Sequence, residues 1–144
     1  MMFEKMKEMR EYEAKTQKET AENLEVTRAT YAGWECGKDI IPLRKLNDLA
    51  NLYQVTLDYL VGLKDNPETR QKKIEINPNA ISENIRLIRQ AHHLTQKDLA
   101  NSLKTSQSNI HKYENGKTLI TTMYAIELAK NYNYSLDTLI QKKK

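Results

Sequence analysis

The sequence contains a single cysteine, Cys36, and only one tryptophan and one phenylalanine among its 144 residues. A lone cysteine cannot form an internal disulfide, which excludes a small secreted domain held together by disulfides. No cysteine–histidine cluster has the spacing of zinc ligands. Because large aromatic side chains are scarce, the sequence favours small domains over one extensive core. A reducing, cytoplasmic compartment is the simplest expectation.

Long hydrophobic runs are also missing. No stretch approaches the roughly eighteen consecutive apolar residues of a transmembrane helix, and the first residues, MMFEKMKEMREYE, are charged throughout. A secretory signal would have an apolar centre at this place. Hydrophobic residues make up 39% of the chain and charged residues 29%, which is typical of a soluble protein. We therefore expect no membrane association.

The sequence lacks the patterns of common catalytic sites. It has no paired catalytic carboxylates, no nucleophile motif and no glycine-rich phosphate loop. The three histidines, His92, His93 and His111, suggest a metal site at first sight. We interpret them instead as surface or phosphate-facing groups, because nothing around them completes a ligand set. The expectation is a protein that is not an enzyme and needs no metal or cofactor.

The positive charge lies in the second half of the chain. Residues 1–64 contain ten Lys/Arg and eleven Asp/Glu, whereas residues 81–144 contain ten Lys/Arg and only five Asp/Glu. An excess confined to one half indicates that this half meets a polyanion. Three of its five excess charges come from the lysines at 142–144, so a solubilising tail is the alternative explanation.

The chain repeats itself. Shifting the sequence by 79 residues aligns two segments without a gap, and sixteen positions between Arg10 and Leu60 are then identical to their counterparts. TQKETAENL at 16–24, for example, falls on TQKDLANSL at 95–103. A repeat of this length is too long for a solenoid unit and indicates a duplicated small domain.

The repeat divides the chain into two domains. The first is expected over 1–63, with its central motif at about 16–37, and the second over 81–144, with its motif at about 95–116 and a basic C-terminal tail. Between them, KDNPETRQKKIEINPNA at 64–80 is polar, contains two prolines and lacks apolar periodicity. This composition predicts a flexible linker.

Both copies have the pattern of five short helices. Thr16 and Glu19 form a predicted capping box at the start of a second helix, and Thr95 with Asp98 is its variant in the second copy. Pro42 suits the first turn of a fourth helix, where a backbone N–H is not needed. No segment alternates like a strand next to a hairpin turn. The predicted fold class is therefore all-α.

The segment TQKDLANSLKTSQSNIHKYENG, at 95–116, resembles the helix-turn-helix of the phage repressor/Cro-like (XRE) family of transcriptional regulators. The second copy matches the family pattern at Thr95, Gln96, Leu99, Ala100, Ser106, Ile110, Tyr113, Glu114 and Gly116. The first copy matches at Thr16, Gln17, Ala21, Val26, Thr27, Trp34, Glu35 and Gly37. The resemblance covers nearly the whole chain outside the linker and tail. It implies two small, five-helix, lambda-repressor-like DNA-binding domains in tandem.

The resemblance also implies which side chains meet double-stranded DNA. In the family, the outer face of the third helix reads base edges, and the start of the second helix binds a phosphate. The implied DNA-binding residues of the second domain are Gln96, Ser106, Gln107, Ser108, Asn109, His111, Lys112, Lys117 and Thr118. Those of the first domain are Gln17, Thr27, Arg28, Ala29, Thr30 and Lys38. By the same resemblance, Arg10 with Glu35 and Arg89 with Glu114 form structural ion pairs.

The first copy departs from the family pattern at several places. Gly33 lies in mid-helix, where it costs up to about 1 kcal/mol against alanine. It is therefore expected to permit a close approach, either of a DNA backbone or of another protein helix. Thr20 replaces a core leucine. In the turn before the third helix, both copies lack the expected glycine. The first copy has Glu25 there and the second has Lys104, which predicts some backbone strain.

The leading hypothesis is a sequence-specific, double-stranded DNA-binding transcriptional regulator, with repression the favoured mode. A flexible linker that averages roughly 20–25 Å and can extend to about 55 Å would let one chain engage two half-sites about 34 Å apart. Homodimerisation stays open. The alternative is a protein-interaction or dimerisation module, such as an antitoxin-like protein, in which only the second domain binds DNA. The near-neutral first domain would suit that role.

Overall fold

A computed structural model describes residues 3–142 of the chain. The chain divides into two compact units, residues 1–74 and 75–144. Within the described part there are ten helices and no β-strand apart from an isolated bridge between Val55 and Thr69. The predicted all-α fold class is thus confirmed. None of the helices described is long and apolar enough to cross a membrane.

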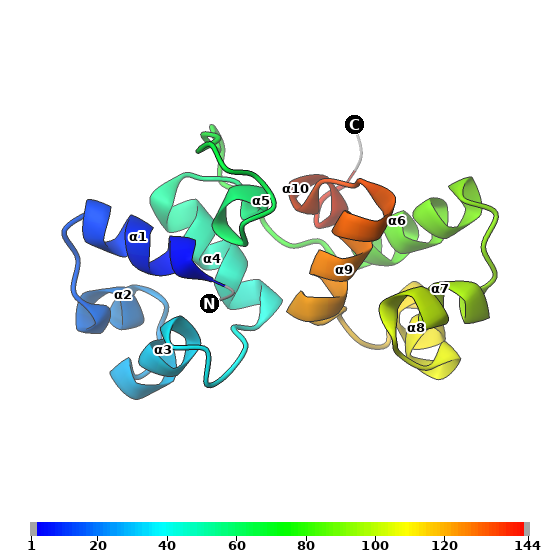
Figure 1. Ribbon diagram of the computed structural model, residues 1–144, viewed down its shortest axis with the longest axis horizontal. Coiled ribbons are helices and arrows are strands. Elements are labelled where there is room, and N and C mark those ends of the chain that lie inside the picture. The colour runs from blue at the N-terminus through cyan, green and yellow to red at the C-terminus, as the bar shows by residue number, and fades with distance from the viewer. Residues whose placement is uncertain (1–2, 143–144) are drawn as a thin grey trace. The chain divides into compact units, whose positions relative to one another are not determined.

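Each unit is built from five helices, coloured in chain order in Figure 1. Those of the first unit are α1 Glu4–Tyr12, α2 Gln17–Asn23, α3 Arg28–Glu35, α4 Leu43–Tyr53 and α5 Leu57–Leu60. Those of the second unit are α6 Pro78–Ala91, α7 Gln96–Leu103, α8 Gln107–Glu114, α9 Thr122–Tyr132 and α10 Leu136–Leu139. Helix α6 begins earlier in its domain than α1, because Asn77 caps it and Pro78 starts it.

The duplication extends to the backbone. Left-handed residues recur at the repeat distance of 79 residues, so that Glu25 is matched by Lys104 and Gly37 by Gly116. The turn before α3 and α8 keeps this conformation although a glycine is missing, with φ of 58° at Glu25 and 59° at Lys104. A left-handed residue with a side chain costs about 1–2 kcal/mol, so the helix packing on either side outweighs that strain.

Both capping boxes predicted from the sequence form. The Thr16 and Thr95 hydroxyls accept hydrogen bonds from the backbone N–H groups of Glu19 and Asp98, each at 3.0 Å. The carboxylates of those two residues accept in return from the backbone N–H of the cap. Each box therefore satisfies a helix donor that would otherwise have no partner inside the helix.

Apolar side chains three or four positions apart supply a separate core for each unit. The fully buried side chains of the first core include Met6, Leu46, Leu49 and Leu57. Those of the second include Ile81, Ile85, Leu99 and Ile110. Trp34 and Tyr113 are each only 5% exposed, so these aromatic residues close the cores.

The first core carries hydroxyl groups where the second is apolar. Thr20 takes the place of Leu99, and its hydroxyl lies 3.4 Å from the hydroxyl of Tyr53. Tyr31 takes the place of Ile110 and is fully buried. Its hydroxyl makes no hydrogen bond of ordinary geometry among the described residues, and burial, together with the nearby Glu35 carboxylate, raises the pKa of this phenol.

Replacing Tyr31 by phenylalanine is therefore expected to stabilise the first unit by about 1 kcal/mol, because the ring stays and an unsatisfied polar group leaves. Thermal unfolding should show a melting temperature higher by about 5 °C. Tyr53→Phe is the matched control, since its hydroxyl meets Thr20, and it should lower the melting temperature. A lower melting temperature for Tyr31→Phe would mean that this hydroxyl is bonded in solution.

The segment expected to be a flexible linker, residues 64–80, is largely ordered. Its first part belongs to the first unit, which ends at residue 74. Arg70 is only 5% exposed, and its Nη1 donates to the side-chain oxygens of Asn47 at 2.7 Å and Asn51 at 2.8 Å. At the other end, α6 starts at Pro78. The polar composition thus reflects hydrogen bonds to α4 and not a solvated tether.

Candidate nucleic-acid interface

Helices α7 and α8 form the helix-turn-helix of the second unit. The turn between them is short, with Lys104 left-handed and the backbone N–H of Thr105 donating to the Ala100 carbonyl at 2.9 Å. Ala100 and Leu103 are each 2% exposed. A small residue at position 100 lets the two helices pack closely at this crossing. The outer face of α8 is thereby held on a rigid base.

The exposed residues of α8 share one face. Gln107, Ser108, His111 and Lys112 are all exposed, and their spacing of one, four and five residues places them on one side of a helix. Ile110, Tyr113 and Glu114 lie on the opposite side and are buried. The exposed set offers amide, hydroxyl, imidazole and ammonium groups, which hydrogen-bond to base edges or phosphates.

Three other predicted residues are already engaged within the unit. The Ser106 hydroxyl accepts from the backbone N–H of Asn109 at 3.1 Å, and the Asn109 side chain donates to Thr105 Oγ1 at 2.8 Å. Gln96 Nε2 donates to Glu114 Oε1 at 3.4 Å. Ser106 keeps its hydroxyl hydrogen and Gln96 a second amide hydrogen, so both retain a donor. Asn109 is half-buried and points back toward the turn.

The loop after α8 supplies the last predicted residues of this domain. Gly116 is left-handed with φ of 78°, and the two residues that follow it, Lys117 and Thr118, are exposed. The backbone N–H of Lys117 donates to the Lys112 carbonyl at 3.0 Å, which ties the loop to the end of α8. Lys112 and Lys117 thus bring two ammonium groups to the same end of the helix.

A buried ion pair fixes α8 to α6. Arg89 Nε donates to Glu114 Oε2 at 2.7 Å and Arg89 Nη2 to Glu114 Oε1 at 2.9 Å. The Glu114 side chain is only 3% exposed. Arg86, which the sequence did not single out, adds a hydrogen bond to the Glu114 carbonyl at 2.8 Å. The position of Arg86, one helical turn before Arg89 on the same helix, is the sequence feature that indicates this second contact to Glu114.

The first unit repeats this pair. Arg10 Nε donates to Glu35 Oε2 at 2.7 Å, and Gln17 Nε2 donates to Glu35 Oε1 at 3.2 Å. Burial alone would raise the pKa of Glu35, but the hydrogen bond from Arg10, the nearby Tyr31 hydroxyl and the hydrogen bond from Gln17 outweigh it and lower that pKa. The hydrogen bond to Glu35 also raises the pKa of Arg10 against its partial desolvation. The folded protein therefore stabilises the ionised forms of Arg10 and Glu35.

The outer face of α3 is plainer than that of α8. Thr27, Arg28, Ala29 and Thr30 are exposed, as is Lys38 in the following loop. Thr27 caps the helix, accepting from the Thr30 backbone N–H at 3.2 Å and donating to Thr30 Oγ1 at 2.9 Å. Arg28 and Lys38 are therefore the cations that this face presents.

Gly33 has an internal role, which corrects the expectation that it admits a DNA backbone or a second protein. The residue is buried, and a Cβ placed there would lie 3.2 Å from Asp39 Oδ2. The Asp39 backbone N–H also donates to the Gly33 carbonyl at 3.2 Å. Glycine at 33 thus makes room for the loop that follows α3 in the same unit.

Charge separates the two faces. At matched positions the second domain has Lys104 where the first has Glu25, and Thr118 where the first has Asp39. Lys112 has Gly33 as its counterpart, whereas the first domain has Arg28 where the second has Gln107. All of these except Gly33 are exposed. A polyanion is attracted by the second face more strongly than by the first.

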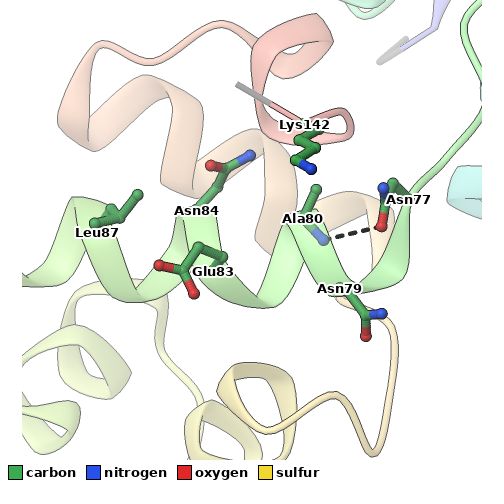
Figure 2. A pocket seen from close by; sticks show the side chains of 7 residues that line it. All are labelled: Asn77, Asn79, Ala80, Glu83, Asn84, Leu87 and Lys142. Atoms are coloured by element: carbon green, nitrogen blue, oxygen red, sulfur yellow. Dashed lines mark hydrogen bonds between the residues drawn. The ribbon is translucent and has the colours of Figure 1, made fainter. Parts of the chain in front are cut away.

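Cavities open on both units within the described part of the chain. The one in Figure 2, of about 440 Å³, lies beside α6 and is lined in part by Asn77, Asn84 and Leu87. The Asn84 amide donates to the carbonyls of Leu139, Thr138 and Gln141 at the end of α10. No group of three His, Cys, Asp or Glu in the described residues could hold a metal ion.

Comparison with known proteins identifies the fold of both units. The sequence model of a helix-turn-helix family matches residues 6–60 and again residues 85–139. The chain is 32% identical over 73 residues to YobD, an uncharacterized HTH-type transcriptional regulator of Bacillus subtilis (strain 168). That match covers 51% of this chain and 65% of the relative. No solved structure matches the chain. The chain therefore belongs to the XRE-type helix-turn-helix family, whose domain it carries in two tandem copies.

Proposed function

We propose that the protein regulates transcription by binding double-stranded DNA in a sequence-specific manner, with the second domain as the main reader. The observation that carries this proposal is the outer face of α8, where four exposed polar side chains lie on a helix whose inner side is locked by an ion pair. A helix of this size fits the major groove, where each base pair offers a distinct pattern of donors and acceptors.

The groups on α8 match that pattern. Gln107 has the amide that pairs with the N6 and N7 atoms of adenine, and Lys112 has a donor for O6 and N7 of guanine. Ser108, between them on the same face, donates or accepts. Phosphate contacts by Gln96 and Lys117 on either side would fix the register of the helix on the duplex.

Repression is the mode of regulation that we favour. A protein that occupies an operator excludes other proteins from that stretch of DNA, and it needs nothing beyond binding to do so. Activation would require, in addition, a surface that contacts the transcription machinery. YobD, the relative that carries the helix-turn-helix name, is itself uncharacterized, so the proposal rests on the chemistry of α8.

The salt dependence of DNA binding tests which domain meets the phosphates. We expect the double variant Lys112→Ala/Lys117→Ala of the full chain to lower the slope of log K against log salt by about 0.9, since the lost phosphate contact of Lys117 removes about that much, whereas Lys112 is assigned to a base edge. Fluorescence anisotropy of a labelled duplex over a salt series measures it. The matched variant in the first domain, Arg28→Ala/Lys38→Ala, should change the slope less. Equal slopes for the wild type and the Lys112→Ala/Lys117→Ala variant would refute the assignment.

A second function for the first domain has support of its own. A cavity of about 470 Å³ beside α1 and α3 is lined mainly by acidic groups. Its lining consists of Glu4, Glu8, Glu11 and Glu35, together with Lys7, Cys36 and Gln17, the residue expected to bind a phosphate. These acidic groups weaken the attraction of this domain for DNA and favour contact with a basic protein surface. If the Arg28→Ala/Lys38→Ala variant binds DNA like the wild type, this role is the better account of the first domain.

A further inference from the structure

Residues 64–74, here called the strap, run back along the first unit instead of leaving it. The backbone N–H of Thr56 donates to the Glu68 carbonyl at 3.1 Å, and that of Arg70 donates to the Gln54 carbonyl at 2.9 Å. These two bonds flank the bridge between Val55 and Thr69. Residues 68–70 of the strap are therefore paired with the turn between α4 and α5.

Two asparagines on α4 hold the end of the strap. Asn51 pairs with Ile74 as a strand would, since its Oδ1 accepts from the Ile74 N–H at 3.0 Å and its Nδ2 donates to the Ile74 carbonyl at 2.8 Å. Asn47 Nδ2 donates to the same carbonyl at 2.9 Å. Arg70 binds the oxygens of both asparagines, so it cross-links the strap to α4.

This arrangement is specific to the first domain. The repeat places Ile126 and Lys130 of the second domain where the first has Asn47 and Asn51. Asn47 is only 3% exposed, and burying an amide costs free energy unless it is hydrogen-bonded. In the first domain α4 therefore has one buried and one half-buried amide whose hydrogen bonds go to the strap.

The docked strap leaves a very short tether. Ile74 is bonded to α4, while the Asn77 N–H donates to the Ile140 carbonyl of the second unit at 2.9 Å. Glu75 and Ile76 alone lie between them. Such a link spans at most about 11 Å, whereas residues 64–77 would span about 45 Å if the strap were released.

We propose that the strap makes this protein specific for the spacing between two DNA half-sites, with Arg70 as the positioning residue that holds the spacing. The inference rests on the proposed function, and it adds that the first domain also meets the duplex. A short tether raises the effective concentration of the weaker domain at one spacing and excludes spacings that it cannot reach. Release of the strap would remove that selection, because a long flexible tether reaches many spacings.

Selection of duplexes from a random library by the full chain, followed by a series of gaps between the selected half-sites, tests the proposal. The wild type should prefer one gap about tenfold over a gap longer by five base pairs, which turns the second half-site to the opposite face of the duplex. Arg70→Ala should reduce this preference to threefold or less and should lower affinity at the best gap. Lys72→Ala, which removes an exposed cation from the same strap, is the matched control and should behave like the wild type.

A second variant covers the case in which Arg70→Ala destabilises the first unit. Insertion of Gly-Ser-Gly-Ser between Glu75 and Ile76 lengthens the tether while every bond of the strap stays in place, and it should relax the gap preference in the same way. A wild-type selection that returns a single half-site would overturn the spacing proposal and leave DNA binding by the second domain standing. A gap preference unchanged in both variants would also overturn it. No enrichment of any sequence would instead refute the proposed function.

Discussion

Replacing Gln107 and Lys112 together by alanine is expected to lower the affinity of the full chain for its selected DNA site by a hundredfold or more. Each good contact to a base edge supplies about 1–3 kcal/mol of discrimination, and about 1.4 kcal/mol is a factor of ten in affinity. Both side chains are exposed on the outer face of α8. Their removal therefore costs little stability, since exposed substitutions usually change the free energy of unfolding by less than about 0.5 kcal/mol.

Competition binding with the selected duplex and a scrambled duplex measures the effect. The double variant should approach the same affinity for both duplexes, because the phosphate contacts that remain carry no sequence information. Arg28→Ala, at the position in α3 that matches Gln107, is the control in the first domain, and we expect a loss of less than tenfold. A double variant that still distinguishes the two duplexes like the wild type would show that another surface reads the sequence.

Replacing Glu114 by alanine is expected to unfold the second unit while the first stays folded. The change leaves the Arg89 guanidinium without its carboxylate in a site where the Glu114 side chain is 3% and the Arg89 side chain 17% exposed. Removing one partner of such a pair costs about 3–5 kcal/mol. For a unit of this size that lowers the melting temperature by about 15 °C or more.

Two other variants make this result specific. Glu83→Ala breaks an exposed pair with Arg86 at 3.6 Å, and we expect a change of less than about 1 kcal/mol because surface ion pairs contribute little. Glu35→Ala removes the equivalent carboxylate of the first unit and should unfold that unit instead. Thermal unfolding followed by near-ultraviolet circular dichroism, together with DNA binding, separates the units. One transition shifted equally by both buried variants would mean that the two units unfold as one.

The fold was predictable because it depends on local and repeated signals. The capping boxes at Thr16 and Thr95, the repeat of 79 residues and the family pattern each indicate the same helices. The outer face of α8 follows from helical spacing once Ile110 and Tyr113 are assigned to the core. Agreement between independent local signals is what makes a fold readable from one sequence.

The strap could not be predicted, because its bonds join residues far apart in sequence. Arg70 lies 23 residues from Asn47 and 19 from Asn51, and nothing in the local composition distinguishes a docked polar segment from a solvated one. The sequence does contain one signal of a buried polar contact. In α4, LRKLNDLANLY, Asn47 stands at a position where the helical spacing of the buried residues predicts an apolar side chain. Gly33 was misinterpreted for the same reason, as its neighbour Asp39 comes from a loop whose path no periodicity describes.

The hydroxyl pair in the first core bears on how a duplicated chain avoids misassembly. Two copies of one domain can exchange equivalent helices while they fold, and tandem repeats are prone to this error. Exchange of α2 for α7 would set Leu99 in the place of Thr20 and leave the buried Tyr53 hydroxyl without the partner it has at 3.4 Å. The cost of such an unpaired group, about 1–3 kcal/mol, penalises the hybrid. Divergence of the two interiors thus keeps each copy paired with its own helices, while the sequence that both copies share keeps the fold.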